Sequence, residues 1–285
     1  MATKLANRNR GKGEKMSDEK SIYEPLDRPE VTNYLFHPRG ESGFGSGEKR
    51  FEELTIPVDE NVTIGARFYA CDKRAPVLLF FHGNGEIVED YDDIGQFYQR
   101  MNINFFPVDY RGYGISTGKP TVTAMMNDCN KIFDFAVNYL RSNGFEGAIV
   151  IMGRSLGSAS VLELTNTRKD LVDGLIIESG FAFALPLLKL VGINLDSIGV
   201  TEDLIANDKK IDGFDKPTLI IHAEFDHIIP FSDGEHLYNQ SPDQDKRMLK
   251  VPGANHNDIL ARGLENYMQA VKELLERAVK FHAGR

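Results

Sequence analysis

The pentapeptide Gly153-Arg154-Ser155-Leu156-Gly157 constrains the fold of this chain more than any other segment does. It follows the apolar run 147–152 and precedes the small-residue stretch 158–162, which suits a helix. This context predicts a strand, a sharp turn and a helix, with the serine on the turn. A side chain at either flanking glycine would collide with the neighbouring strand or helix. We therefore expect Ser155 to have strained backbone angles and an exposed hydroxyl, with a helix N-terminus behind it.

A serine becomes a strong nucleophile beside a base, and the base needs an acid that orients it. Asp226 comes just after one apolar strand pattern, and His256 comes just after the next. Because the carboxyl ends of parallel strands meet at one edge of a sheet, we expect Ser155, Asp226 and His256 to converge there. Glu178, which ends an earlier strand pattern, is the alternative acid.

Another apolar run, 75–81, is typical of a strand covered on both faces, and it ends in His82-Gly83-Asn84-Gly85. Acyl-transfer chemistry needs backbone N–H groups that point at the developing oxyanion. We expect one donor from Leu156, the residue after the serine. The second is expected from the glycine-rich loop, from Asn84 or alternatively from Gly85. Losing one such donor typically costs about 3–4 kcal/mol of transition-state stabilisation.

These segments resemble the alpha/beta-hydrolase family, in its compact branch of small serine hydrolases and serine aminopeptidases. The resemblance rests on residues 82–85, 109–116, 153–157, 224–230 and 253–256 and covers most of the chain from about residue 51 onward. It implies Ser155 as nucleophile, Asp226 as orienting acid and His256 as general base. It also favours Asp226 over Glu178, because residues 224–230 have the Glu-x-Asp-x-x-x-Pro shape of the family. In one small departure, Ala223 stands where many relatives have glycine.

Strand and helix patterns alternate along the chain, which predicts an α/β fold with a mostly parallel sheet and helices on both faces. The resemblance makes this the alpha/beta-hydrolase fold, as one domain over residues 31–285. Residues 1–30 are expected to form a disordered or extended tail. The pattern predicts strands near 51–58, 62–70, 76–82, 103–109, 147–153, 173–178, 217–223 and 246–251, and helices near 86–101, 121–142, 156–168, 233–240 and 265–281.

The interval 179–216 is longer than a plain crossover between strands. Lids or caps insert here in the family, and this insert has room for a short lid or flap of one to three helices. It could form an apolar wall for an acyl or aromatic group, or an ordinary crossover packed on the sheet. The expected substrate-binding residues are Gly85, Tyr110, Tyr113, Phe181, Phe183 and Ile228.

Composition excludes several other classes of protein. The net charge of −9 argues against a nucleic-acid partner, and two cysteines do not make a disulfide framework. No run reaches the roughly 18–20 apolar residues of a membrane span. The first fifteen residues are basic but lack a following apolar segment, so they do not read as a secretory signal, and we expect a cytoplasmic protein. Met1 and Met16 both remain possible starts.

Cofactor motifs are incomplete in this sequence. Residues 83–85 imitate a dinucleotide-binding loop, but Val88 occupies the position of its third glycine. No His-Glu-x-x-His spacing or cysteine pair indicates zinc. We therefore expect no metal and no organic cofactor.

The expected function is a serine hydrolase that cleaves a carboxylic ester or thioester of a small-molecule acyl substrate through an acyl-enzyme. The alternative within the same fold is a serine peptidase or aminopeptidase, in which Glu86 or Glu178 could hold a free amine. The alternative of another class is a non-catalytic ligand-binding or scaffold protein. The sequence leaves the oligomeric state open.

Overall fold

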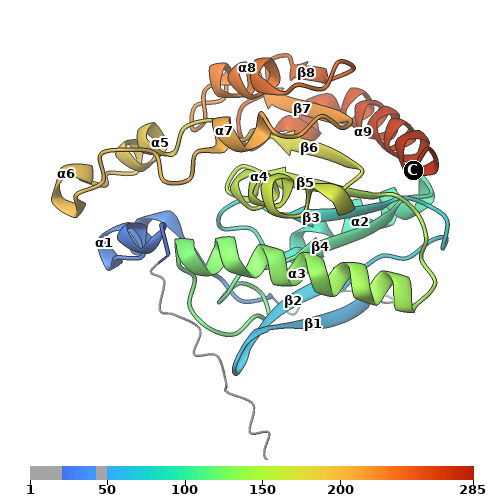
Figure 1. The fold of residues 1–285 in the computed structure, drawn as a ribbon, viewed down its shortest axis with the longest axis horizontal. Coiled ribbons are helices and arrows are strands. Elements are labelled where there is room, and N and C mark those ends of the chain that lie inside the picture. The colour runs from blue at the N-terminus through green and yellow to red at the C-terminus, as the bar shows by residue number, and fades with distance from the viewer. Residues whose placement is uncertain (1–20, 43–49) are drawn as a thin grey trace, which may run out of the picture.

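The computed structural model describes residues 21–42 and 50–285, which build an eight-stranded sheet between two layers of helices (Figure 1). The strand order is β1-β2-β4-β3-β5-β6-β7-β8. Neighbours from β4 to β8 are parallel, whereas β1–β2 and β2–β4 are antiparallel. The mostly parallel sheet predicted from the sequence is confirmed. The strands are β1 (Glu52–Asp59), β2 (Val62–Phe68), β3 (Val77–Phe81), β4 (Asn104–Val108), β5 (Ile149–Arg154), β6 (Gly174–Glu178), β7 (Thr218–Ala223) and β8 (Arg247–Val251).

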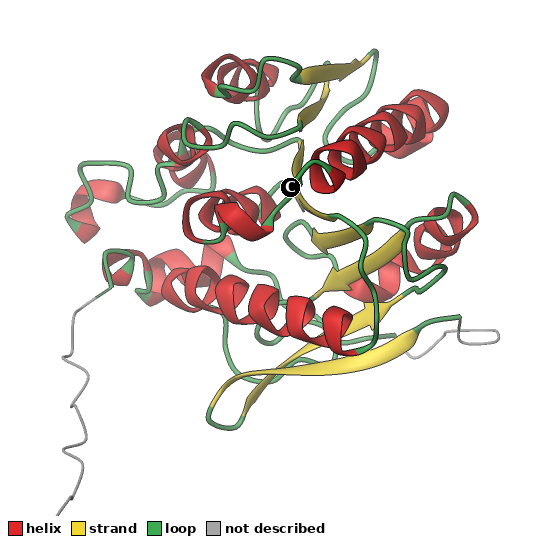
Figure 2. Ribbon diagram, turned by 45° about the vertical axis from the view of Figure 1, so that its right-hand side comes forward, coloured by secondary structure: helices red, strands yellow, loops and turns green. Residues whose placement is uncertain are grey.

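Helices cover both faces of this sheet (Figure 2). The helices α3 (Val122–Ser142), α4 (Gly157–Thr167) and α8 (Phe231–Gln240) contribute side chains to one apolar core. The helices α2 (Asp92–Arg100) and α9 (Ile259–Ala283) contribute to the core on the opposite face. The helix expected at 86–101 is divided in the structure, because the short 3-10 helix η2 (Val88–Tyr91) precedes α2.

Strand β3 shows why the central strands have such apolar sequences. All five of its residues are buried, and their side chains alternate between the two cores. Val77, Leu79 and Phe81 belong to the core that includes α3 and α4, whereas Leu78 and Phe80 belong to the core that includes α2 and α9. A parallel strand covered on both faces has no solvent-facing side, so its sequence lacks polar alternation.

The N-terminal part of the described chain corrects one expectation. The sequence pattern predicts a disordered or extended tail to residue 30, but residues 24–26 form the 3-10 helix η1 (Glu24–Leu26), and α1 (Pro29–Leu35) begins before residue 31. Tyr23 and Leu26 are buried in the main core, which is the core that includes α3, α4 and α8. Such short helices are stabilised by tertiary packing rather than by their own propensity, so the sequence carries little signal for them. Residues 1–20 lie outside the described residues.

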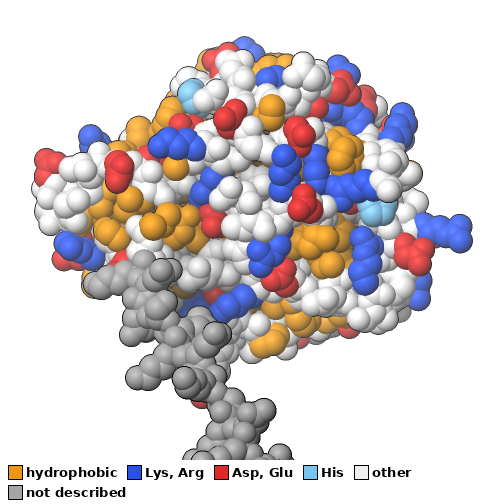
Figure 3. Space-filling view, viewed as in Figure 1, with side chains coloured by type: hydrophobic (Ala, Val, Ile, Leu, Met, Phe, Trp, Pro, Cys, Tyr) orange, Lys and Arg blue, Asp and Glu red, His pale blue; other side chains and the backbone are white. Residues whose placement is uncertain are grey.

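Residues 179–216 contain three short helices, α5 (Ala184–Leu190), α6 (Leu195–Ile198) and α7 (Asn207–Ile211). α7 packs against α4 and α8. α5 and α6 extend away from the sheet on the side of α1 (Figure 1), and hydrophobic side chains gather on this part of the face (Figure 3). Leu190, on α5, is 61% exposed. Whether this segment moves as a lid stays a prediction.

Figure 3 also shows basic and acidic side chains interspersed over this face of the molecule. Among the ion pairs of the described residues, Arg168, which follows α4, pairs with Asp134 on α3, with Nε and Oδ1 2.7 Å apart. Within residues 21–42 and 50–285, no helix combines the length and the apolar character that crossing a bilayer requires.

Candidate active site

Ser155 lies on the turn between β5 and α4, as the pentapeptide predicts. Its φ of 51° is in the left-handed region, which costs a non-glycine residue about 1–3 kcal/mol. Its N–H donates to the carbonyl oxygen of Glu178 at 2.9 Å, which ties the turn to β6. A Cβ on Gly157 would lie 2.1 Å from the carbonyl oxygen of Phe81, and one on Gly153 would lie 2.4 Å from that of Gly157. The flanking glycines are therefore required by close backbone contacts.

The loops after β7 and β8 bring two further side chains to this turn. His256 Nε2 lies 3.0 Å from Ser155 Oγ, and His256 Nδ1 lies 2.8 Å from Asp226 Oδ2. A carboxylate can only accept, so Nδ1 carries the proton and Nε2 is free to accept the hydrogen of the serine hydroxyl. These distances are within the range for proton transfer. All three side chains are largely buried, since Ser155 is 8% exposed, His256 is 4% exposed and the Asp226 side chain is fully buried, so the expectation of an exposed serine hydroxyl is wrong.

Asp226 is held as a carboxylate by its surroundings. Its Oδ1 accepts hydrogen bonds from the N–H groups of Ile228 at 3.0 Å and Ile229 at 2.9 Å. Burial alone would raise the pKa of Asp226, but the hydrogen bond from His256 and these two N–H donors outweigh it and hold the pKa below its usual value. Asp226 therefore stays charged while it orients the imidazole.

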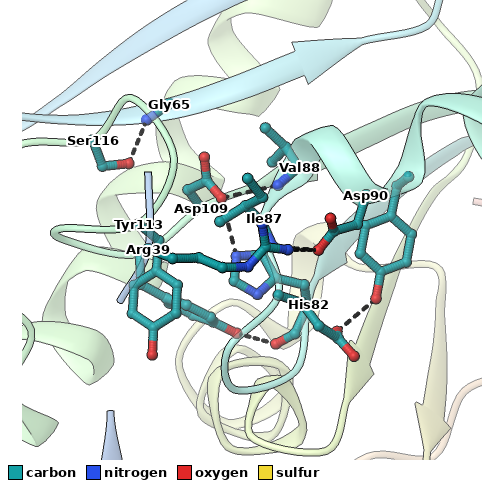
Figure 4. Close-up of polar contacts among 12 residues, drawn as sticks. Arg39, Gly65, His82, Ile87, Val88, Asp90, Asp109, Tyr113 and Ser116 are labelled. Carbon is teal, nitrogen blue, oxygen red and sulfur yellow. Dashed lines mark hydrogen bonds and ion pairs between the residues drawn. The ribbon is translucent and has the colours of Figure 1, made fainter. Parts of the chain in front are cut away.

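The loop after β3 lies beside this turn and is stabilised by buried hydrogen bonds of His82 and Asp109. His82 Nε2 lies 3.1 Å from Asp109 Oδ1, and His82 Nδ1 lies 2.7 Å from the carbonyl oxygen of Gly83. Both side chains are fully buried, and Asp109 also accepts from the N–H of Val88 at 3.0 Å (Figure 4). His82 thus stabilises the conformation of this loop.

The side-chain amide of Asn84 is held by hydrogen bonds. Its Oδ1 accepts from the hydroxyl of Tyr113 at 2.7 Å. Burial raises the pKa of Tyr113 to about 12, even though the backbone N–H groups of His37 and Gly85 face its hydroxyl oxygen. Within the described part of the chain, neither the N–H of Asn84 nor the N–H of Leu156 has a protein acceptor. Both donors are thus available for a ligand oxygen.

Comparisons with known proteins agree with this fold. Residues 72–191 match the family model of serine aminopeptidase, S33. The structure of Est1E from Butyrivibrio proteoclasticus with bound ferulic acid superposes with a TM-score of 0.64 at 21% identity, covering 79% of this chain and 98% of that one. The chain has the alpha/beta-hydrolase fold.

Two curated relatives of this chain come from yeasts. An uncharacterized membrane protein of Saccharomyces cerevisiae, YNL320W, is 26% identical over 235 residues, which is 79% of each chain. Protein bem46 of Schizosaccharomyces pombe is 28% identical over 237 residues, which is 79% of this chain and 76% of the relative. The likeness therefore extends beyond the segment matched by the family model.

Arg154 is a residue of the candidate site that the sequence reasoning missed. Its Nη1 lies 2.5 Å from Glu86 Oε1, its Nε lies 3.2 Å from Glu178 Oε1, and its Nη2 donates to the carbonyl oxygen of His256 at 2.9 Å. Glu86 in turn accepts from the N–H of Gly83 at 2.6 Å. One buried cation therefore links the loop after β3 to the loop after β8. The available signal was a charged residue inside an otherwise small and apolar turn.

Glu86 and Glu178 are placed differently from either role considered for them. Both carboxylates pair with Arg154, and Glu178 also accepts from the hydroxyl of Tyr267 at 2.7 Å. Asp226, rather than Glu178, lies against Nδ1 of His256. Both glutamates therefore neutralise the guanidinium of Arg154.

The residues expected to bind substrate fall into two groups. Tyr110, Tyr113 and Phe181 are buried in the main core, and the Tyr110 hydroxyl donates to the carbonyl oxygen of His82 at 2.7 Å. Phe183 is 36% exposed and packs against the ring of His236. Direct contact with substrate stays a prediction for the full set, which is Gly85, Tyr110, Tyr113, Phe181, Phe183 and Ile228.

Proposed function

We propose that this hydrolase cleaves a carboxylic ester or thioester by two-step acyl transfer at Ser155. The observation that carries the proposal is the continuous relay from Ser155 Oγ to His256 Nε2 at 3.0 Å and from His256 Nδ1 to Asp226 Oδ2 at 2.8 Å. A serine beside a base that is itself oriented by a carboxylate is the arrangement of a nucleophilic hydrolase.

In the first step, His256 takes the proton of Ser155 as Oγ attacks the carbonyl carbon of the substrate. The N–H groups of Leu156 and Asn84 stabilise the oxyanion of the tetrahedral intermediate. His256 then gives its proton to the leaving alcohol or thiol, the bond from the acyl carbon breaks, and an acyl-enzyme remains. Asp226 stabilises the imidazolium and keeps its tautomer.

In the second step, His256 takes a proton from water while the oxygen of that water attacks the acyl carbon. The same two N–H groups stabilise the second oxyanion. Collapse of this intermediate breaks the bond to Ser155 Oγ, which recovers its proton from His256. The carboxylic acid product leaves, and the site returns to its starting state.

Peptidase activity is the second candidate, because the matching family model is described as serine aminopeptidase. An aminopeptidase must also hold the free amine of its substrate, usually with a carboxylate. The two carboxylates considered for that role, Glu86 and Glu178, pair with Arg154. Est1E was solved with ferulic acid, an aromatic carboxylic acid, which supports an acyl group as the recognised part. These points favour ester or thioester substrates.

Hydrolysis of p-nitrophenyl esters from acetyl to palmitoyl, beside an aminoacyl p-nitroanilide, tests the proposal. We expect ester cleavage by the wild type and by Ser232→Ala, which removes an exposed hydroxyl on α8. Ser155→Ala should lose about 10³-fold or more of that rate, as expected when the nucleophile of a triad is removed. A fluorophosphonate probe should label the wild type at Ser155 alone.

The other outcomes would overturn the proposal in distinct ways. Ester cleavage that survives in Ser155→Ala would exclude Ser155 as the nucleophile. Cleavage of the anilide alone would make the protein a peptidase. Inactivity on every substrate, together with no labelling by the fluorophosphonate, would favour a ligand-binding or scaffold function.

A further inference from the structure

Residues 36–42, which follow α1, lie against the loop that carries Asn84. The N–H of His37 donates to Asn84 Oδ1 at 2.9 Å, and Asn84 Nδ2 lies 2.8 Å from His37 Nδ1. Arg39 donates from Nε to the carbonyl oxygen of Gly85 at 2.7 Å and pairs with Asp90, as Figure 4 shows. The segment therefore contacts both of the residues that end the loop.

The orientation of the Asn84 amide follows from its partners. Its Oδ1 accepts from two donors, the hydroxyl of Tyr113 at 2.7 Å and the N–H of His37 at 2.9 Å. A flipped amide would place its NH₂ group against the N–H of His37, which can only donate. Nδ2 consequently points at His37 Nδ1, which accepts its hydrogen bond as the unprotonated nitrogen of a neutral imidazole.

Asn84 has the only side chain in the sequence Gly83-Asn84-Gly85. Gly85 has a φ of 75°, so the loop ends in a backbone conformation available mainly to glycine. On its other side, the loop is held by the bond from the N–H of Gly83 to Glu86. The amide of Asn84 is therefore the contact that the loop's own side chain makes with the rest of the protein, in addition to the bonds from Arg39 and Glu86 to its backbone.

The segment with His37 is itself anchored. Val31, Leu35 and Phe36 are buried in the main core. Further upstream, the hydroxyl of Tyr23 donates to Glu163 on α4 at 3.0 Å, and Asp27 accepts from the N–H of Thr123 at the start of α3 at 2.9 Å. His37 is exposed, but it directly follows Phe36, which is buried in the core.

We propose that His37 is a positioning residue for the oxyanion hole and acts by holding the side chain of Asn84. The proposal rests on the function proposed above, in which the backbone N–H of Asn84 stabilises the oxyanion. A donor of this kind contributes only if its direction is set before the reaction, because reorienting it during the reaction would cost the energy that it supplies. His37 contacts Asn84 rather than the reacting atoms, so its effect should fall on kcat.

Two substitutions separate the hydrogen bond from the bulk of the side chain. His37→Leu removes the acceptor of the Asn84 amide and keeps the backbone bonds of residue 37. His37→Asn supplies Oδ1 at the place of Nδ1 and so restores the acceptor. Tyr34→Ala is the matched control, because Tyr34 is 56% exposed on the preceding helix.

We expect His37→Leu to lower kcat about 10–100-fold on the best p-nitrophenyl ester, with KM within about twofold, as misplacement of a catalytic group does. His37→Asn and Tyr34→Ala should stay within about threefold of wild type, which is less than 1 kcal/mol at 1.36 kcal/mol per tenfold. In a protein that already carries Asn84→Ala, adding His37→Leu should change kcat by less than about twofold, because both changes remove the same interaction.

Hydrogen exchange of the peptide that covers residues 82–87 gives a readout independent of turnover. Exchange should be faster in His37→Leu than in wild type and unchanged in His37→Asn. Unchanged kcat and exchange in His37→Leu would overturn the proposal, as would a His37→Asn variant as impaired as His37→Leu. A rise in KM alone would make His37 a substrate contact instead. Loss of the proposed function would be seen separately, as wild-type turnover that does not depend on Ser155.

Discussion

The carbonyl oxygen of His256 accepts a hydrogen bond of 2.9 Å from Nη2 of Arg154, the residue that precedes the serine in sequence. The same guanidinium pairs with Glu86 and Glu178. Burial opposes its charged form, but the two carboxylates outweigh this and raise the pKa of Arg154 above its usual value. A permanently charged group therefore fixes the loop of the base relative to the loop of the oxyanion donor.

Arg154→Met should destabilise the protein by about 3–5 kcal/mol, because it leaves the buried carboxylate of Glu178 and the partly exposed one of Glu86 without their cation. Arg154→Lys keeps the charge but loses the fork that reaches three partners, so it should fold and lose about tenfold or more in kcat. Urea unfolding and ester hydrolysis measure the two effects. Arg262→Met is the control, since Arg262 forms an exposed pair with Asp258 and should change stability by less than about 1 kcal/mol. An unchanged urea midpoint for Arg154→Met would contradict this account.

Ser155→Gly should be more stable than Ser155→Ala by about 1 kcal/mol, and both should be inactive. Both variants lose the hydrogen bond to His256, so their difference reports the left-handed backbone at φ 51°. Thermal unfolding of the two variants measures it. Equal midpoints would mean that the turn stores no such strain.

Gly157→Ala should destabilise the protein by about 1–3 kcal/mol or more and lower activity, as overpacking in a filled core does. Its Cβ would lie 2.1 Å from the carbonyl oxygen of Phe81, so either β3 or the turn must shift. Gly213→Ala serves as the comparison, because the nearest atom to its Cβ, the carbonyl oxygen of Lys210, lies 3.9 Å away. Stability and kcat measured on both variants test this, and a harmless Gly157→Ala would speak against it.

Asp226 makes the stability of the wild type depend on acid. Its pKa in the folded protein lies below the unfolded value of about 3.9, so its contribution is present above that pH and is lost as pH falls through the folded pKa. The stability difference between wild type and Asp226→Asn should therefore shrink when the pH is lowered from 7 to about 3. Urea unfolding across this range measures the difference, and a constant difference would contradict the assignment.

The same depressed pKa bears on catalysis. Asp226 remains ionised over the pH range in which an imidazole titrates. As the pH is lowered, kcat/KM should therefore fall with the protonation of a single group. Asp226→Asn should lower kcat about 10⁴-fold near neutral pH, because the imidazole loses the partner that sets its tautomer. If kcat/KM instead fell with the protonation of two groups, a second essential carboxylate would be indicated.

Part of the fold and of the candidate site could be predicted from residues that are close in the chain. The apolar run of β3 predicted a strand covered on both faces, and the pentapeptide around Ser155 predicted the turn between β5 and α4. Asp226 and His256 were found because each follows a strand pattern directly, and parallel strands end at the same edge. Local pattern was sufficient wherever backbone geometry alone places a side chain.

The remaining features depend on partners that are distant in the chain. The sequence offered Glu86 and Glu178 as carboxylates that could hold a substrate amine, and it gave no sign that both pair with Arg154. The bond from the Tyr110 hydroxyl to the carbonyl oxygen of His82 likewise has no signal in the sequence. The direction of a long side chain is decided by which partner lies within its reach, and no local pattern encodes that.

The sequence by itself determined where strands and helices alternate along the chain. It also determined the turn that carries Ser155 and the loops that carry Asp226 and His256, because these follow from hydrophobic periodicity and glycine sterics. Only the tertiary structure decided that His37, 47 residues before Asn84, faces the amide of that residue. It also decided that the residues after Ser21 pack as short helices. Contacts of this kind form when distant segments are brought together by burial of the core, so they exist in the folded chain alone.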